Sequence, residues 1–213
     1  MIPNHTYDSP NKGGRRLETL GVVIHSTRGG ASSPAQEWAG TINWFLKQAS
    51  QVSAHRVVHV DGANAQLVAD ELVAWHARSY NQTWLGIEVV QPKSSHTFTE
   101  SQYRTTARII VDWAEKFGFT PDRDHIKGHD EIQAGKTDPG MMWSWPHFMQ
   151  CVKEAMMPNV GGKFQTVHSL IKPLIGEAVA EAVNQDEFWS QLFERGMMQQ
   201  DRAGGVHVYL EMK

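Results

Sequence analysis

The sequence lacks the features that mark several large classes of protein. Its 213 residues contain a single cysteine, Cys151, so no disulfide can form within the chain, and we expect this thiol to be a small buried side chain. No run of about 18 apolar residues occurs, which predicts no membrane insertion. Residues 1–8 contain neither a basic stretch nor an apolar one. We therefore expect synthesis in the cytoplasm without a signal peptide.

An excess of positive charge is also missing. The chain has 20 lysines and arginines against 23 aspartates and glutamates, a net charge of -3. No basic stripe is available to neutralise phosphates, so we expect no nucleic-acid partner. The length suffices for a buried core, either in one domain with an appended segment or in two small domains. We predict a catalytic domain over residues 1–158 and a C-terminal extension over residues 159–213.

The first 120 residues alternate between two kinds of pattern. Short runs rich in Val, Ile and Leu predict strands at residues 20–25, 56–60, 66–69 and 85–90. Ser33 followed by Pro34 predicts the start of one helix, and Thr99 with Gln102 predicts the start of another that Gly118 ends. Strands with helices between them predict an α/β fold, a sheet covered by helices.

Three separated fragments carry metal-binding side chains. His25 follows an apolar β-branched run, as expected at the end of a buried strand, whereas His129 and Asp138 lie nine residues apart in a segment with Gly, Lys and Pro. Two imidazoles and one carboxylate are the donors of a hydrolytic zinc centre, because three protein ligands leave a fourth position for water. We predict that these three residues bind Zn²⁺.

At these residues the chain resembles the type 2 N-acetylmuramoyl-L-alanine amidases, a family that includes phage lysozymes, bacterial anhydromuropeptide amidases and animal peptidoglycan recognition proteins. The resemblance covers roughly residues 18 to 150. It is carried by the following fragments, in the family's order: Val22–Thr27, Val52–His55, Ala74–Ala77, Leu85–Glu88, Gly128–Asp130 and Lys136–Gly140. It implies a zinc amidase fold with a central mixed β-sheet flanked by helices.

The resemblance also implies two catalytic side chains. Glu88 stands in the Gly-Ile-Glu context of the family's catalytic glutamate, and strand alternation points it away from its apolar neighbours. From periodicity alone, Glu88 would be an ordinary solvent-facing residue of an amphipathic strand. Lys136 matches the family's catalytic lysine, which stabilises an oxyanion, whereas a lysine on an exposed loop is usually only solvated. Several phage relatives have a tyrosine that assists catalysis directly before the histidine at position 55, but this chain has Ala54 there. We therefore expect catalysis to depend more on Glu88.

Three further residues are expected to contact substrate. Trp75 and His76 match the family's substrate-groove segment, although Trp75 fits the core equally well. His55 is either a substrate-contacting residue or a buried, hydrogen-bonded strand histidine. The neighbouring Arg56 would reach a peptide carboxylate.

Together these residues predict an enzyme that hydrolyses the amide between N-acetylmuramic acid and L-alanine in peptidoglycan or a muropeptide. Two alternatives remain: a cytosolic amidase that recycles muropeptides and a non-catalytic peptidoglycan-binding module. The lack of a signal peptide favours a phage or prophage endolysin, which acts on the cell wall after release.

The extension is predicted to be mainly helical. Apolar residues recur at helical spacing over residues 170–182, and Asp186–Gly196 has the pattern of a short capped helix with Phe188, Trp189 and Phe193. Val206–Leu210 is a possible strand. The extension either packs on the catalytic domain or mediates self-association or wall binding.

Overall fold

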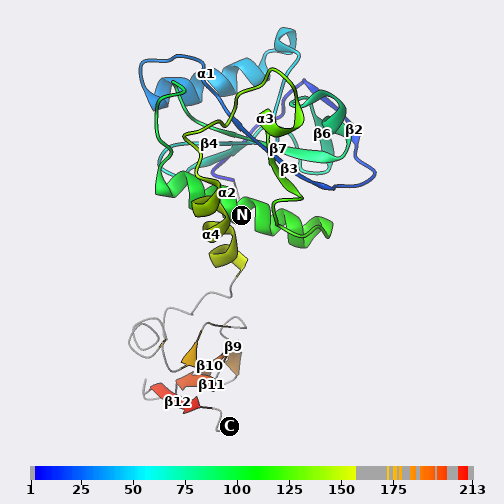
Figure 1. The fold of residues 1–213 in the computed structure, drawn as a ribbon. Helices are drawn as coiled ribbons and strands as arrows, with labels where there is room; N and C mark the ends of the chain where they lie inside the picture. Colours follow the sequence, from blue (N-terminus) through cyan, green and yellow to red (C-terminus); the bar gives the residue numbers. More distant parts are fainter. Residues whose placement is uncertain are drawn as a thin grey trace. The chain divides into compact units, whose positions relative to one another are not determined.

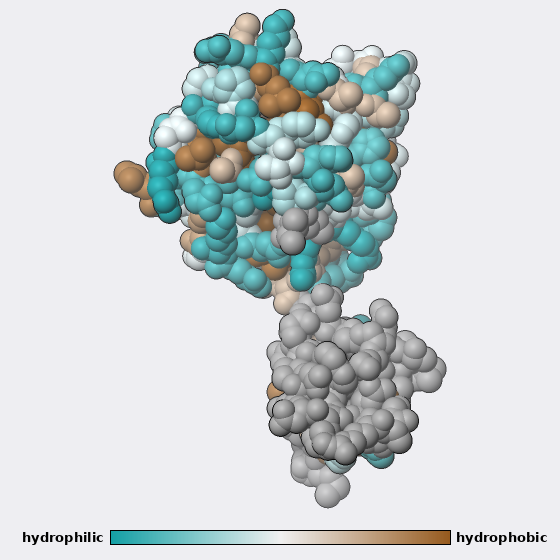
Figure 2. Space-filling model, turned by 180° about the vertical axis from the view of Figure 1, so that it is seen from behind, coloured by the Kyte–Doolittle hydropathy of each residue, from teal (hydrophilic) through white to brown (hydrophobic). Residues whose placement is uncertain are grey.

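The computed structural model describes residues 3–156 and, beyond them, 172, 175–176, 178, 183–185, 188–194, 196–200 and 206–210. The chain divides into two compact units, Met1–Ala155 and Met156–Lys213. In the part of the chain described, no helix combines the length and the apolar character needed to cross a bilayer. The rear face of the first unit is mostly hydrophilic, with hydrophobic residues in small groups (Figure 2).

The first unit is built on a six-stranded mixed sheet with the order β1-β5-β4-β7-β3-β8 (Figure 1). Strands β4, β7, β3 and β8 are parallel to one another, whereas β5 is antiparallel to β4. The strands are β1 (His5–Thr6), β3 (Gly21–Ser26), β4 (Arg56–Val58), β5 (Asn64–Gln66), β7 (Trp84–Val89) and β8 (Ile126–Gly128). A separate antiparallel pair joins β2 (Lys12–Arg15) to β6 (Leu72–Ala74).

Helices cover both faces of this sheet (Figure 1). Helix α1 (Pro34–Leu46) packs Ile42 and Phe45 on one face, while α2 (Glu100–Phe117) and α4 (Trp145–Met156) cover the other. The first unit is completed by the short helices η1 (Gln48–Ser50), η2 (Arg78–Gln82) and α3 (His129–Ile132). The predicted α/β fold with a central mixed sheet between helices is therefore confirmed.

The helix ends follow local chemistry. The Ser33 side chain accepts a hydrogen bond from the Gln36 backbone N–H at the start of α1. Thr99 and Gln102 form a reciprocal capping box at the start of α2. Gly118 ends α2 with a φ of 78°, which glycine adopts at little cost.

Alternation within two adjacent strands determines which residues face α1. In β7, Leu85, Ile87 and Val89 belong to the core beneath α2 and α4, so Glu88 points to the opposite face. The register pairs His25 of β3 with Glu88 of β7. Parallel strands carry both residues to the same carboxyl edge, which is where ligands bind in open α/β sheets.

The second unit contains a four-stranded antiparallel sheet with the order β12-β11-β10-β9. Its strands are β9 (Val183–Gln185), β10 (Phe188–Phe193), β11 (Gly196–Gln200) and β12 (Val206–Leu210). The strand predicted at Val206–Leu210 is confirmed, but the helix predicted over Asp186–Gly196 is wrong. A short aromatic-rich run fits the periodicity of a helix and that of a strand, and pairing with β9 and β11 makes it a strand. The helix predicted over residues 170–182 lies largely outside the described residues.

Candidate metal centre and active site

Three donor atoms from distant parts of the chain meet at the carboxyl edge of the sheet. Nδ1 of His25 lies 2.9 Å from Nδ1 of His129 and 3.2 Å from Oδ2 of Asp138. Nδ1 of His129 lies 3.1 Å from the same carboxylate oxygen. His25 stands at the end of β3, His129 begins α3, and Asp138 lies on the loop that follows α3. The structure thus brings together the three residues predicted as metal ligands.

The spacing of these atoms fits a tetrahedral metal. Zinc binds imidazole nitrogen and carboxylate oxygen at about 2.0–2.1 Å, so neighbouring ligand atoms around it stand about 3.3 Å apart. The three observed separations of 2.9–3.2 Å are close to one triangular face of such a tetrahedron. Two nitrogen atoms would not approach so closely without a shared ion or proton. The donor set and its geometry therefore fit one zinc ion.

The electrostatics favour the protonation states that bind metal. Burial lowers the pKa of His25, which keeps its imidazole neutral and its lone pair available. Although burial opposes ionisation of Asp138, the hydrogen bonds with His129 and His25 hold the pKa of this carboxyl below its ordinary value. At neutral pH the cluster therefore offers a neutral nitrogen of His25 and an anionic oxygen of Asp138.

Glu88 lies next to the three donors on the face that α1 covers. Its Oε2 is buried and has no hydrogen-bond partner. Burial, with the negative charge of Asp138, raises the pKa of Glu88 well above its ordinary value, against the opposing effect of Lys136. A carboxyl with a raised pKa is a stronger base than an ordinary carboxylate, so Glu88 is equipped to accept a proton and return it.

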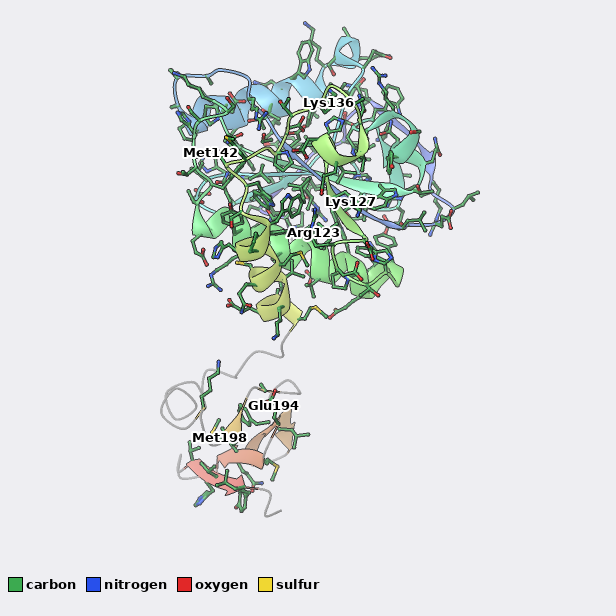
Figure 3. The ribbon with its side chains drawn as sticks, viewed as in Figure 1. Arg123, Lys127, Lys136, Met142, Glu194 and Met198 are labelled. Carbon is green, nitrogen blue, oxygen red and sulfur yellow. The ribbon has the colours of Figure 1, made fainter. Side chains whose placement is uncertain are left out.

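Lys136 and Asp138 share one loop, which Arg28 holds in place. The Lys136 side chain is exposed and lines the same cavity as His25 and Glu88, and Figure 3 shows it beside α3. The Arg28 guanidinium donates hydrogen bonds to Oγ1 of Thr137 at 2.8 Å and to the carbonyl of Pro139 at 2.7 Å. Arg28 therefore fixes the residues on both sides of Asp138.

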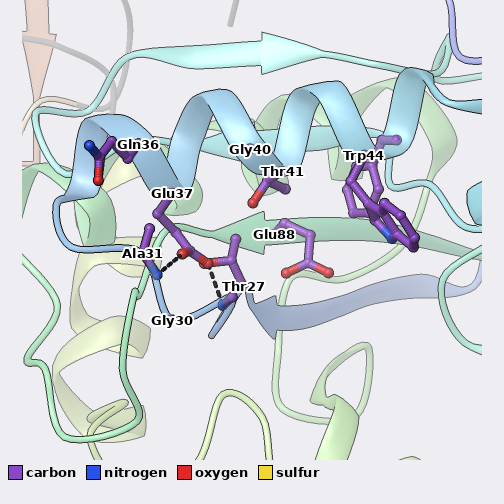
Figure 4. A pocket seen from close by; sticks show the side chains of 11 residues that line it. Thr27, Gly30, Ala31, Gln36, Glu37, Gly40, Thr41, Trp44 and Glu88 are labelled. Atoms are coloured by element: carbon purple, nitrogen blue, oxygen red, sulfur yellow. Dashed lines mark hydrogen bonds between the residues drawn. The ribbon is translucent and has the colours of Figure 1, made fainter.

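Two adjoining cavities meet at Glu88. The first, of about 290 Å³, contains the three donors, Trp75, His76 and Lys136. The second, of about 590 Å³, runs along α1. Both are lined by Thr27, Phe45 and Glu88, so they form one groove, and Figure 4 shows Glu88 among the side chains that line the larger cavity.

The family is established by comparison with known proteins. The family model of the N-acetylmuramoyl-L-alanine amidases matches residues 15–141. The chain belongs to this family. The prediction that it is an amidase is therefore confirmed.

Named relatives agree with this assignment. The amidase is 25% identical over 155 residues to N-acetylmuramoyl-L-alanine amidase A of Achromobacter lyticus, a match covering 63% of this chain and 84% of the relative. It is 30% identical over 111 residues to the 1,6-anhydro-N-acetylmuramyl-L-alanine amidase AmpD of Salmonella typhimurium, a match covering 48% of this chain and 58% of that protein.

Solved structures support the fold. A crystal structure of a selenomethionine derivative of AmpD matches with a TM-score of 0.60 and 22% identity, covering 71% of this chain and 96% of that one. The structure of PlyL matches with a TM-score of 0.57 and 16% identity, covering 75% of this chain and 100% of that one.

The residues predicted to contact substrate in the amidase occupy three different positions. Trp75 is half-buried and lines the cavity. His76 also lines it, but both of its ring nitrogens have hydrogen-bonding partners, Nε2 of His25 and the carbonyl of Trp84. His55 is fully buried, and its Nδ1 accepts a hydrogen bond from the Gly86 N–H. Of the two alternatives for His55, the structure therefore agrees with the buried, hydrogen-bonded histidine, and substrate has no access to it.

Arg56 is likewise withdrawn from the groove. Its guanidinium donates to both carboxylate oxygens of Asp70, at 2.9 and 3.1 Å, and its side chain is buried. The suggested contact with a peptide carboxylate is wrong, because the guanidinium is buried and already paired with Asp70.

Two contributors to the groove escaped prediction from the sequence. Arg28 gives no signal because its partners lie more than 100 residues away. Glu37 is buried in α1, and its carboxylate accepts hydrogen bonds from the backbone N–H groups of Gly29 and Ala31 (Figure 4). Glu37 thereby fixes the loop that walls the larger cavity. In the sequence, a glutamate beside the apolar positions of a helix looks like an ordinary surface residue.

Cys151 is buried, as predicted. Together with Glu100 and His147 it forms a second group of side chains whose metal-binding atoms lie within 4.8 Å of one another. There, Nε2 of His147 lies 2.7 Å from Glu100 Oε2, and Glu100 also pairs with Arg104. Burial raises the pKa of the thiol, which disfavours the thiolate that binds metal. The amidase therefore has one convincing metal-binding geometry among its described residues.

Proposed function

We propose that this chain is a zinc-dependent N-acetylmuramoyl-L-alanine amidase that cleaves the amide between the lactyl group of N-acetylmuramic acid and L-alanine. One observation carries the proposal: His25, His129 and Asp138 converge to within 3.2 Å at a cavity that also contains Glu88 and Lys136. Three donors with an open fourth side are the arrangement of a hydrolytic rather than a structural zinc site.

The surrounding side chains divide the work of hydrolysis. Zinc held by the three donors would lower the pKa of a water molecule and polarise the scissile carbonyl. Glu88 takes a proton from the attacking water and returns it to the departing amine, a role that suits its raised pKa. The ammonium of Lys136 approaches the anionic oxygen that develops on the carbonyl carbon and stabilises it.

The groove provides room for substrate on both sides of the reacting bond. The smaller cavity holds the chemistry, and the larger one continues from Glu88 along α1 to Trp44. Trp44 is 51% exposed, and the Lys47 ammonium lies over its ring at 5.8 Å from the centroid, so the ring can stack on a sugar ring or a stem peptide through its other face. A groove extending past the reacting centre suits a glycopeptide substrate.

A direct test is mass spectrometry of purified cell wall treated with the protein. New free L-alanine amino termini are expected, together with about one zinc per chain, loss of activity on strong chelation and recovery on adding zinc. A fully active metal-free protein would refute zinc dependence. Cleavage at another bond would refute the proposed specificity.

The biological setting we propose is that of a phage or prophage endolysin. A cytosolic recycling amidase is the second candidate, because the relative from Salmonella typhimurium is an anhydromuropeptide amidase. Parallel rates on intact wall and on soluble anhydro-muropeptides separate the two. A marked preference for the small substrate would favour recycling. A non-catalytic binding module fits less well, because both histidines and Asp138 are present and converge.

For the C-terminal unit we propose wall binding or self-association. Its β12 exposes three consecutive apolar side chains, Val208, Tyr209 and Leu210. Phe193 is buried, so it does not supply such a contact. Ending the chain at Asn159 should preserve cleavage of a small soluble muropeptide but reduce activity on intact wall or change the sedimentation behaviour. Insoluble protein would instead indicate that the extension packs on the catalytic domain.

A further inference from the structure

His76 lies directly behind one of the three metal-binding atoms. Its Nδ1 is 3.0 Å from Nε2 of His25, and its own Nε2 is 3.1 Å from the carbonyl oxygen of Trp84. The rings of His25 and His76 stand at 90° to each other with centroids 5.2 Å apart. The sequence predicted a substrate contact for His76, but the structure gives both of its ring nitrogens partners inside the protein.

The hydrogen-bonding roles in this chain of atoms are mutually consistent. The Trp84 carbonyl can only accept, so Nε2 of His76 carries the hydrogen and its Nδ1 is left as an acceptor. Nε2 of His25 must then donate to that Nδ1, which leaves the lone pair of His25 on Nδ1. That is the atom that faces His129 and Asp138. A backbone carbonyl therefore determines, through His76, which nitrogen of His25 is free to bind metal.

The packing around His76 is adapted to its position. A Cβ added at Gly86 would lie 2.6 Å from Cγ of His76, so only glycine at this point of β7 leaves room for the ring. The backbone at His76 is held by Asn81, whose Oδ1 accepts hydrogen bonds from the backbone N–H groups of His76 and Ala77. The ring therefore has little freedom to turn away from His25.

We propose that His76 is a positioning residue for the metal centre: it holds the His25 ring in the orientation and tautomer that present Nδ1 to zinc. The inference rests on the proposed zinc-dependent function. A hydrogen bond of this kind restricts the ligand and increases its basicity, and its loss typically weakens metal binding about 10- to 100-fold.

The test is the zinc dissociation constant of the full chain, measured by competition with a chelator. His76→Leu keeps the bulk of the side chain but removes both hydrogen-bonding atoms, and we expect zinc affinity to fall about 10- to 100-fold. His76→Gln should retain most of the affinity, because an amide oxygen accepts and an amide N–H donates. Gly86→Ala leaves His76 chemically intact but displaces its ring, so it should also weaken zinc binding.

His125→Leu is the matched control, because it removes an imidazole that pairs with Asp122 outside the groove. Zinc affinity should be unchanged in this variant. Urea unfolding of the metal-free proteins provides a second readout. If His76→Leu does not fold, Gly86→Ala and His76→Gln decide the question by the same measurement.

The outcomes separate this inference from the proposed function. If folded His76→Leu bound zinc as tightly as the unchanged protein and showed only a raised KM, His76 would be a substrate contact and the inference would be wrong. If the unchanged protein bound no zinc, the proposed metal centre would itself fail. Weak binding by His76→Leu with near-normal binding by His76→Gln would establish the positioning role.

Discussion

Two polar clusters in the same domain use buried histidines in opposite ways. In the metal-binding cluster, His25 and His129 turn nitrogens toward Asp138 at the edge of an open cavity. In the second, which we call the arginine cluster, His55 lies with Arg16, Arg56 and Asp70 inside the domain. Nε2 of His55 is 2.9 Å from Arg16 Nη1 and 3.0 Å from the Leu72 carbonyl.

The two clusters differ in how their polar groups are paired. In the arginine cluster, Asp70 accepts two hydrogen bonds from Arg56, and both nitrogens of His55 have partners. In the metal-binding cluster, by contrast, Nδ1 of His25, Nδ1 of His129 and Oδ2 of Asp138 point at one another. Polar groups that are paired with one another stabilise a fold, whereas converging acceptors require a cation. The residue types alone do not separate the two.

The largest expected effect comes from removing one carboxylate of the metal-binding cluster. Asp138→Ala deletes a charged zinc ligand, so activity should fall by about 10³-fold or more, with loss of bound zinc. Asp138→Cys should retain part of both, because zinc accepts thiolate as well as carboxylate. Zinc content and amide hydrolysis are measured on the same preparation. An active Asp138→Ala protein would show that the converging atoms are not a catalytic metal site.

The corresponding change in the arginine cluster should affect stability instead. Asp70→Ala leaves the buried guanidinium of Arg56 without its carboxylate, which we expect to cost about 3 kcal/mol of unfolding free energy. Lys116 also reaches Asp70, at 3.6 Å, and this contact would be lost too. Zinc content and activity per folded molecule should be retained. Denaturant unfolding and zinc analysis provide the two readouts, and loss of zinc at full stability would contradict the comparison.

The local parts of this structure were predictable because their causes are local. The capping box of Thr99 and Gln102 and the left-handed Gly118 involve residues within a few positions of one another. The strand β10 was not predictable in that way, since its apolar spacing fits a helix equally well. Its pairing with β11 depends on residues beyond it, and no pattern within Phe188–Phe193 reveals that partner.

The same contrast holds within the site. The donors at positions 25, 129 and 138 were accessible to sequence reasoning because each stands in a recognisable fragment at the end of a strand or on a loop. The roles of Arg28 and His76 were not, because they depend on contacts made across 109 and 51 residues of sequence. A histidine in a groove segment could equally face the substrate or a neighbouring metal-binding side chain. Only the 3.0 Å distance between His76 and His25 decides between these two roles.

The third prediction tests whether Glu88 acts chemically beside the metal-binding cluster. Glu88→Gln keeps the shape of the side chain but removes its ability to take a proton, so turnover should fall by about 10²-fold while zinc content stays the same. Glu154→Gln is a suitable control, since Glu154 is an exposed residue of α4. Near-normal turnover in Glu88→Gln would mean that this buried carboxyl only shapes the groove.

The smallest effect concerns pH and the arginine cluster. Burial, with the charge of Arg16, lowers the pKa of His55 from its ordinary 6.5 to about 3. Between these values the unfolded chain binds a proton at His55 that the folded protein does not. Unfolding free energy should therefore fall as pH is lowered from about 6 to about 4, by about 1 kcal/mol per pH unit from this residue.

His55→Gln removes that titration, so the metal-free variant should show a shallower loss of stability over the same range. Burial also lowers the pKa values of His25 and His76, and it raises that of Glu88, which acts with the opposite sign. These groups remain in both proteins, so their effects cancel in the difference between the two curves. Urea unfolding of both proteins at several pH values, with a chelator present, measures that difference. Parallel curves would mean that His55 is protonated in the folded protein and that water reaches its ring.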